Sequence, residues 1–219
     1  MKHAKHCLQF LLFLIFSNHI KAQLPVIEEP HHKPVLVNDY VRLLDVHLNA
    51  GDTTFYHIHA APSVIVMISS SVIGMQKLGE APSASSQVFP GQTSFMAYGE
   101  HPITHRVYNS GNNVFHVMDI ELAKKDPSPD SCAALQQNNV QTTINEKLVR
   151  VYKFDLNSLQ SISISKSSCA HLLICISGEI STTGKKIKTG EYIFFNPDIE
   201  ISLSNKQQES SSCVLLELK

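Results

Sequence analysis

The sequence predicts an all-β protein built from two consecutive units of short strands. Runs rich in Val, Ile, Thr, Tyr and Phe alternate with turns rich in Gly, Pro, Asn and Asp. Many short strands separated by frequent turns are typical of a sandwich or a barrel. The strand pattern stops over residues 123–144 and resumes beyond them, which divides the chain into two units.

The first 22 residues have the composition of a secretory signal peptide. Lys2 and Lys5 give a basic start, residues 8–16 form an apolar run, and the small residue Ala22 precedes a segment that stops a helix. The apolar run is too short to span a membrane comfortably. We expect cleavage after Ala22 and a secreted or periplasmic protein without a membrane anchor. The alternative is a signal anchor that the mature protein keeps.

The first unit follows a short N-terminal segment. Residues 23–34 are rich in Pro and His and are expected to form an extended lead-in. His31 and His32 are expected to be a mobile surface pair, and the alternative is that they contact a metal. Residues 35–122 then form the first domain, and Gly51 belongs to one of its turns. Its expected strands are 41–48, 53–59, 64–68, 72–78, 93–98, 103–109 and 114–122.

A linker joins the two units. Residues 123–144 contain clustered Lys, Asp, Pro and Ser, and Ser131 is a candidate N-cap for a short helix that runs through Gln137. Residues 145–219 form the second unit, with expected strands at 149–156, 171–177, 190–195, 199–204 and 213–218.

Composition narrows the range of partners. The net charge is −1, and removal of residues 1–22 leaves 15 basic and 19 acidic residues, so no basic face for nucleic acid is expected. The chain contains no nucleophile elbow, P-loop or dinucleotide fingerprint. The expected partner is therefore a small-molecule substrate or ligand, and a homodimer is compatible with the sequence.

Four cysteines remain after the expected cleavage: Cys132, Cys169, Cys175 and Cys213. In an exported chain they allow three disulfide pairings, among which the sequence does not choose. Buried unpaired thiols are at least as good an interpretation for Cys175 and Cys213.

His57 and His59 suggest a metal site. They lie two residues apart in a segment of Thr, Phe, Tyr and Ile, which favours a strand. Residues at i and i+2 of a strand point to the same face, so the two imidazoles would lie side by side, as a divalent metal requires. The alternative is a pair of polar residues on a solvated strand face.

Residues 35–122 resemble the cupin superfamily. The first cupin motif has the form G-x5-H-x-H, which Gly51, His57 and His59 match, and the second ends in H-x3-N, which His105 and Asn109 match. The resemblance implies a barrel whose three histidines bind one divalent metal, with iron as the first choice and zinc, nickel or manganese as alternatives.

The chain departs from the cupin pattern at one ligand position. Cupins usually add a glutamate to the three histidines, and here Ser63 stands near the position of that glutamate. Some cupin dioxygenases use three histidines alone, so a metal is still expected. The loss of a negative charge should weaken binding and change the metal preference.

The second half resembles a degenerate copy of the same domain. The run from His171 to Glu179 is similar to the strand and turn after the first motif, and the segment from Gly190 to Pro197 is similar to the start of the second motif. Ile201 stands where the metal histidine would be, so this half should bind no metal. The resemblance implies two tandem double-stranded β-helix (jelly-roll) domains, the second structural.

Two functions follow from the resemblance. The first is an exported metal-binding cupin that acts as a small-molecule dioxygenase or isomerase, and the second is a non-catalytic cupin that binds a small ligand with the metal incidental or absent. Beside the three metal histidines, the candidates for the substrate pocket are Ser63, His101 and His116. For His101 and His116 the alternatives are an exposed turn and the outer face of the last strand.

Overall fold

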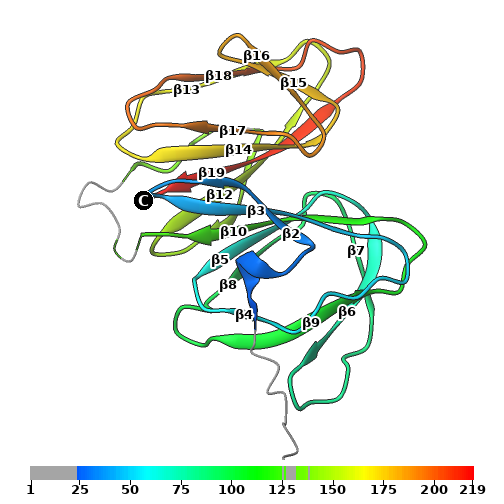
Figure 1. Ribbon diagram of the computed structural model, residues 1–219. Helices are drawn as coiled ribbons and strands as arrows, with labels where there is room; N and C mark the ends of the chain where they lie inside the picture. Colours follow the sequence, from blue (N-terminus) through cyan, green and yellow to red (C-terminus); the bar gives the residue numbers. More distant parts are fainter. Residues whose placement is uncertain (1–23, 125, 127–131, 138) are drawn as a thin grey trace, which may run out of the picture.

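The computed structural model describes residues 24–124, 126, 132–137 and 139–219, which fold into two β-domains that lie against each other (Figure 1). The expected signal peptide and the candidate N-cap Ser131 lie outside the described residues. Within them, the only helical element is the short 3-10 turn η1 (Val26–Glu28). No helix of this part of the chain is long and apolar enough to cross a membrane.

The first domain consists of two five-stranded sheets. One has the order β1 (Leu24–Pro25), β4 (His57–His59), β9 (Ile103–Asn109), β6 (Ser71–Lys77) and β7 (Ser86–Val88). The other has the order β2 (His32–Val37), β3 (Val41–Leu48), β10 (Phe115–Leu122), β5 (Ser63–Met67) and β8 (Thr93–Met96). The pairs are antiparallel except β1 with β4.

The second domain repeats this plan with a five-stranded and a four-stranded sheet. The larger has the order β11 (Val140–Asn145), β12 (Val149–Leu156), β19 (Ser211–Leu218), β14 (Ala170–Ser177) and β17 (Tyr192–Phe195). The smaller has the order β13 (Ser161–Ile164), β18 (Ile201–Ser204), β15 (Glu179–Thr182) and β16 (Lys185–Lys188).

A single apolar core joins the two domains. The β3–β10–β5 part of one domain faces the β12–β19–β14 part of the other in the middle of Figure 1. Met118 and Ile120 from β10 belong to the same buried cluster as Leu172 and Leu216 of the second domain. Both faces of β10 are therefore buried: one points into its own domain and the other towards the neighbouring domain.

The second domain repeats the turn chemistry of the first. The amide nitrogen of Asn109 donates to the carbonyl oxygens of Leu48, Asn49 and Asn113 at 2.8–3.1 Å. The amide nitrogen of Asn205 donates in the same way to Leu156, Asn157 and Glu209 at 2.7–3.2 Å. Four residues before each asparagine stand the motif histidine His105 and the fully buried Ile201, respectively. Ile201 therefore contributes to the core of the second domain.

The turn that precedes the first motif is also repeated, with one substitution. Gly51 has φ +82°, a conformation that glycine adopts without cost. In the second domain Leu159 occupies the corresponding turn with φ +59°, which is strained for a side chain with a Cβ. The two turns thus have a similar backbone geometry, although only the first has a glycine at this position.

The expected helix through Gln137 was wrong, and strands extend into the expected lead-in and linker. Residues 132–137 form no helix. Their polar groups bond to the second domain instead, for example from the Leu135 N–H to the Tyr152 hydroxyl at 3.0 Å. Residues 23–34 are more than a lead-in, because they contain β1, η1 and the start of β2, and β11 already begins at Val140, inside the expected linker.

Cys132 and Cys169 form a disulfide that ties the segment between the domains to the start of β14. Cys175 and Cys213 are free and buried. Of the alternatives that the sequence left open, the structure therefore has the Cys132–Cys169 disulfide together with unpaired Cys175 and Cys213.

Candidate metal centre and its cavity

The three motif histidines converge inside the first domain. β4 is only three residues long, and His57 and His59 at its ends point to the same side. β9 pairs with β4 so that His105 lies opposite His57. The Nε2 atoms of His57 and His59 are 3.0 Å apart, and the centroid of the His105 ring is 4.8 Å and 4.9 Å from those of His57 and His59. The three rings are buried.

A fourth histidine joins them. The expectation that His32 lies on a mobile surface was wrong, because this residue of β2 is only 6% exposed. Its ring centroid is 4.6 Å from that of His57, and the ligand-capable atoms of His32, His57 and His59 lie within 4.8 Å of one another. The sequence signal for His32 was a histidine pair in a Pro-rich segment, too general to distinguish a ligand from a surface residue.

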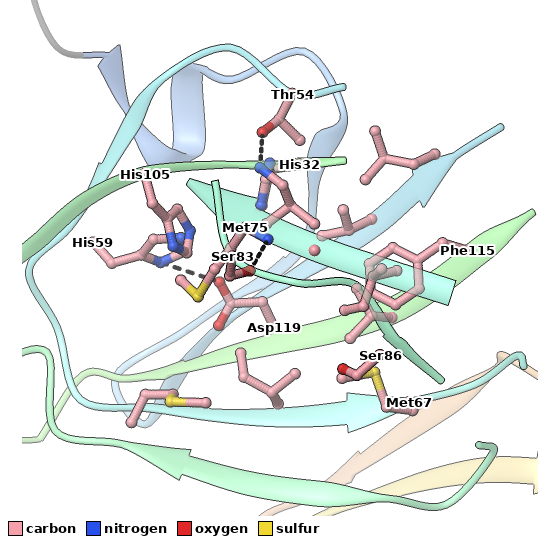
Figure 2. A pocket seen from close by; sticks show the side chains of 18 of the residues that line it. His32, Thr54, His59, Met67, Met75, Ser83, Ser86, His105, Phe115 and Asp119 are labelled. Atoms are coloured by element: carbon pink, nitrogen blue, oxygen red, sulfur yellow. Dashed lines mark hydrogen bonds and ion pairs between the residues drawn. The ribbon is translucent and has the colours of Figure 1, made fainter. Parts of the chain in front are cut away.

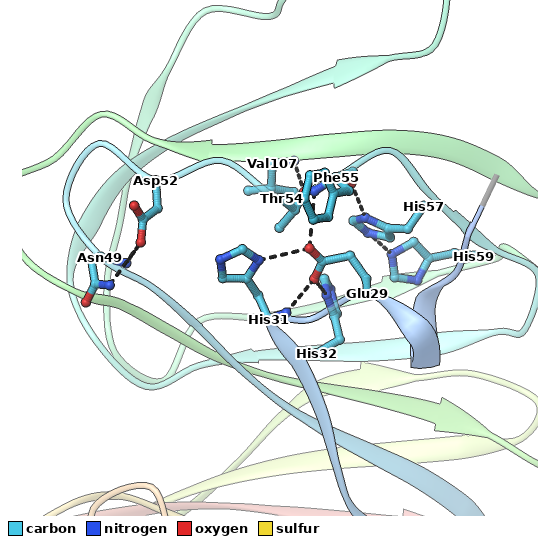
Figure 3. A network of polar contacts seen from close by, with 10 residues as sticks. All are labelled: Glu29, His31, His32, Asn49, Asp52, Thr54, Phe55, His57, His59 and Val107. Carbon is cyan, nitrogen blue, oxygen red and sulfur yellow. Dashed lines mark hydrogen bonds and ion pairs between the residues drawn. The ribbon is translucent and has the colours of Figure 1, made fainter. Parts of the chain in front are cut away.

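Two of the four rings have a hydrogen-bond partner at Nδ1 (Figure 3), and a third ring has a longer contact with a carboxylate there. The Nδ1 atom of His57 is 2.8 Å from the Phe55 carbonyl oxygen, and that of His32 is 2.6 Å from a carboxylate oxygen of Glu29. Contacts of this kind fix the orientation and tautomer of an imidazole and leave Nε2 as the coordinating atom.

The third partner is the carboxylate of Asp119, 3.4 Å from Nδ1 of His59 (Figure 2). The Nδ1 atom of His105 is buried without a hydrogen-bond partner in the described part of the chain. A buried polar atom of this kind requires a partner, and a bound ion or a reoriented ring would supply one.

The environment keeps the motif histidines neutral. Burial lowers the pKa of His57 to about 4, that of His59 to about 2 and that of His105 to about 3, and repulsion between the rings adds to the effect. Imidazole must be neutral to coordinate a metal. Above about pH 5 these rings are therefore in their metal-binding form without loss of a proton.

Asp119 is the other unusual group. It lies on β10, is 3% exposed, and neither of its carboxyl oxygens has a hydrogen-bond partner among the described residues. Burial, followed by repulsion from Glu121, raises the pKa of Asp119 to about 7. Because His59 is neutral, its contact with Asp119 is not an ion pair.

A cavity of about 240 Å³ opens beside the histidines (Figure 2). His59, His105 and Asp119 are the polar groups at one end, and Tyr98 lies over His59 with ring centroids 5.0 Å apart. The rest of the wall is mainly apolar and includes Val46, Leu48, Ile65, Met67, Ile73, Met75, Met96, Val107, Phe115 and Val117. An apolar cavity with a few convergent polar groups is the usual form of a small-molecule site.

No protein-family model matches the chain, and no curated protein sequence matches it. Solved structures do. The bacterial pirin YhhW from Escherichia coli in complex with nickel(II) has a TM-score of 0.62 at 16% identity, over 85% of this chain and 90% of that one. AerE from Microcystis aeruginosa has a TM-score of 0.54 at 11% identity over 87% and 98%. Salicylate 1,2-dioxygenase from Pseudaminobacter salicylatoxidans has a TM-score of 0.56 at 8% identity over 82% and 71%.

These likenesses extend over both domains. The chain has a bicupin fold. At such identities the comparisons establish the fold alone, and the function of a fold depends on its site. The first cupin domain carries the histidine cluster, and the second is filled by its own apolar side chains.

Ser63 stands where the cupin glutamate is missing. It is fully buried, and its hydroxyl donates to the Ala61 carbonyl oxygen at 3.2 Å. On β10, Glu121 pairs with Ser63 of β5. Asp119, two residues earlier on β10, pairs with Ile65 and lines the cavity. The carboxylate that contacts His59 thus comes from a strand that the cupin motifs do not include.

The other two pocket candidates lie outside the cavity. His101 is exposed in a turn and lines an outer depression that shares Met96 and Tyr98 with the cavity. His116 lies on the opposite face of β10 from Asp119, where its Nε2 atom is 2.8 Å from the Asp45 carboxylate. The expectation that His116 lines the pocket was therefore wrong, since the face with Val117 and Asp119 points inward.

The donor set fits a divalent metal. Neutral, buried imidazoles with two Nε2 atoms 3.0 Å apart match the spacing of ligands at about 2.0–2.1 Å from one ion. Metal binding by His57, His59 and His105 stays a prediction, because the ligand-capable atoms within 4.8 Å of one another are those of His32, His57 and His59, and His105 is placed beside them by its ring position.

Proposed function

We propose that this chain is an exported, metal-dependent cupin enzyme that acts on a small apolar molecule, with a dioxygenase reaction as the first choice. The observation that carries the proposal is the cluster of neutral, buried histidines at one end of an apolar cavity. A purely structural barrel would fill that space with side chains, as the second domain does.

In this proposal His57, His59 and His105 hold the metal. When bound, the metal supplies Lewis acidity and, if it is redox-active, electron transfer to dioxygen. The protein residues bind and orient the substrate. The unpartnered carboxyl oxygens of Asp119 accept a hydrogen bond or a proton from a substrate hydroxyl, and Tyr98 limits the space over His59.

The cavity limits the size and chemistry of the substrate. Benzene occupies an engineered apolar cavity of about 150 Å³, so a volume of about 240 Å³ holds on the order of ten non-hydrogen atoms. The wall is mainly apolar away from the end with Asp119 and the histidines, with Thr54, Ser83 and Ser86 as further polar side chains. A substituted single ring with one hydroxyl donor, such as a phenol or a cyclic enol, fits these limits.

Two proteins of similar structure support the proposal through what they bind or do. One is a pirin that was solved with nickel(II), and another is a salicylate 1,2-dioxygenase. We retain iron as the first candidate metal, with nickel and zinc next. Manganese prefers carboxylate and carbonyl ligands and is the least suited to an all-imidazole site.

The test begins with the metal. Protein stripped by a chelator would be reloaded with Fe²⁺, Ni²⁺, Zn²⁺ or Mn²⁺, analysed for bound metal, and assayed for oxygen uptake and product formation with a panel of small phenols and enols. We expect one metal per chain in the wild type and none in the double variant His57→Ala/His59→Ala. A matched control is His101→Ala, which removes an exposed histidine outside the cavity.

Each outcome has a clear meaning. Metal content that is equal in the wild type and in the double variant overturns the proposal. Tight binding of a panel compound without turnover under any metal favours the alternative, a non-catalytic ligand-binding cupin.

We also propose export with cleavage after Ala22. The Cys132–Cys169 disulfide supports this, because such bonds persist mainly in oxidising compartments. The intact mass of protein recovered outside the cytoplasm tests it, and a mass that includes residues 1–22 would contradict it.

A further inference from the structure

The N-terminal strand β2 places a histidine among the motif ligands. His32 is 6% exposed, and its ring centroid lies 4.6 Å from that of His57 and 6.0 Å from that of His59. A ligand-capable atom of His32 lies within 4.8 Å of those of both other rings. This spacing is compatible with one ion that contacts all of them after small rotations of the rings.

The buried carboxylate of Glu29 holds this histidine in place (Figure 3). Glu29 is 1% exposed and accepts contacts from the His32 ring at 2.6 Å, the His31 ring at 2.9 Å, the His31 N–H at 2.8 Å and the Phe55 N–H at 3.1 Å. Phe55 precedes the strand that carries His57, and its carbonyl oxygen contacts the His57 ring. One carboxylate therefore aligns β2 with the strand that carries the first motif.

A role limited to hydrogen bonding with Glu29 would not explain where the His32 ring points. The contact with Glu29 uses Nδ1, which leaves Nε2 for a second partner. His31 serves as an internal comparison, since it contacts the same carboxylate but its side chain is 29% exposed. Of His31 and His32, only His32 belongs to the cluster of ligand-capable atoms with His57 and His59.

We propose that His32 is a fourth imidazole ligand of the metal and takes the place of the carboxylate that is absent at Ser63. This inference rests on the proposed function. The negative charge that a glutamate ligand would bring is found one contact further out, on Glu29 behind His32. Carboxylates behind ligating histidines orient them and raise their basicity.

Two consequences follow from a fourth imidazole. An all-imidazole ligand set favours Cu²⁺, Ni²⁺, Zn²⁺ and Fe²⁺ over Mn²⁺ and Mg²⁺. Metal binding would also be coupled to the docking of β2, because one ligand comes from that strand.

The decisive measurement counts ligands. Pulsed EPR of the Cu²⁺-loaded wild type would count the imidazole nitrogens coupled to the metal, and chelator competition would give the affinity. We expect four imidazoles in the wild type, three in His32→Gln with about 10–1000-fold weaker binding, and no change in the matched variant His31→Gln. Glu29→Gln should keep four imidazoles and weaken binding about 10–100-fold.

The failures of the two proposals are distinguishable. A wild type that binds no metal overturns the proposed function together with this inference. A wild type that binds metal through three imidazoles, or a His32→Gln variant with unchanged ligand count and affinity, overturns this inference alone. The count on the wild type needs no variant, so the test stands even where His32→Gln fails to fold.

Discussion

Replacement of Asp119 by Asn should stabilise the metal-free protein at neutral pH and remove part of its pH dependence. Asp119 is buried in the cavity wall beside neutral His59, and the opposing effects of the Ser63 hydroxyl and of Arg42 do not prevent a raised pKa. Its ionised form is therefore poorly compensated. Asn has nearly the same shape and does not ionise, so the difference between the two proteins isolates the cost of the charge.

The size and sign of the effect follow from the pKa. Burial raises the pKa of Asp119 from 3.8 to about 7. At 1.36 kcal/mol per pKa unit, this corresponds to about 4 kcal/mol. Between pH 4 and 7 the folded state holds a proton that the unfolded state has released, so the free energy of unfolding falls as pH rises through this range and stays low above it. In the Asn variant this fall in the free energy of unfolding with pH should be absent, because Asn does not ionise.

The assay is urea unfolding of both proteins at pH 4 to 8 with a chelator present. The advantage of Asp119→Asn should grow by about 4 kcal/mol from pH 4 to pH 8. Contributions of the histidines that do not contact Asp119 are common to both proteins and cancel, whereas that of His59 does not, because its ring lies 3.4 Å from the Asp119 carboxylate. A difference in the free energy of unfolding that does not change with pH would refute a raised pKa at Asp119. A variant that is less stable than the wild type at neutral pH would show that Asp119 forms an ion pair with a protonated His59.

Three further predictions concern other parts of the molecule. Leu159→Gly should raise the free energy of unfolding by about 0.5–1 kcal/mol, because it relieves a positive φ, whereas Ser158→Gly in the same turn should not; chemical denaturation tests both. Replacement of Cys132 and Cys169 by Ser should lower that free energy by about 4 kcal/mol, since their disulfide closes a loop with a sequence separation of 37, and an unchanged denaturation midpoint would contradict this. Metal affinity should stay nearly constant from pH 7 to about pH 5 and fall below about pH 4, as the lowered pKa of His57, about 4, is passed; a loss centred near pH 6.5 would contradict burial of the rings. Stability of the metal-free protein should fall over the wider range below pH 6.5, because the unfolded chain takes up protons there first.

The sequence was informative where the pattern is local. His57 and His59 lie on one strand, and the turn at Gly51 positions that strand, so residue spacing alone indicated a shared face. The asparagine of the second motif, four residues after His105, holds its turn through three backbone carbonyl oxygens. Such short-range geometry is encoded within about ten residues and could be predicted.

The parts that the sequence did not reveal depend on contacts between distant segments. His32 reaches the cluster only because the buried carboxylate of Glu29 bonds to the chain at Phe55. His116 and Asp119 lie on opposite faces of β10, and because both faces of this strand are buried, hydrophobicity did not indicate which face lines the cavity. The expected helix through Gln137 was wrong because the backbone there is held by bonds to the second domain.

The apolar core shared by the two domains has a consequence for how the chain melts. Met118 and Ile120 on one face of β10 are buried against the second domain, while Asp119 on the other face borders the cavity. Neither domain can detach without exposing this core to water, so the protein should unfold in one cooperative transition. An ion bound among the histidines of the first domain should then raise the melting temperature of both domains by the same amount. The second domain, which has no histidine at the position of His105, is therefore also stabilised by metal binding in the first domain.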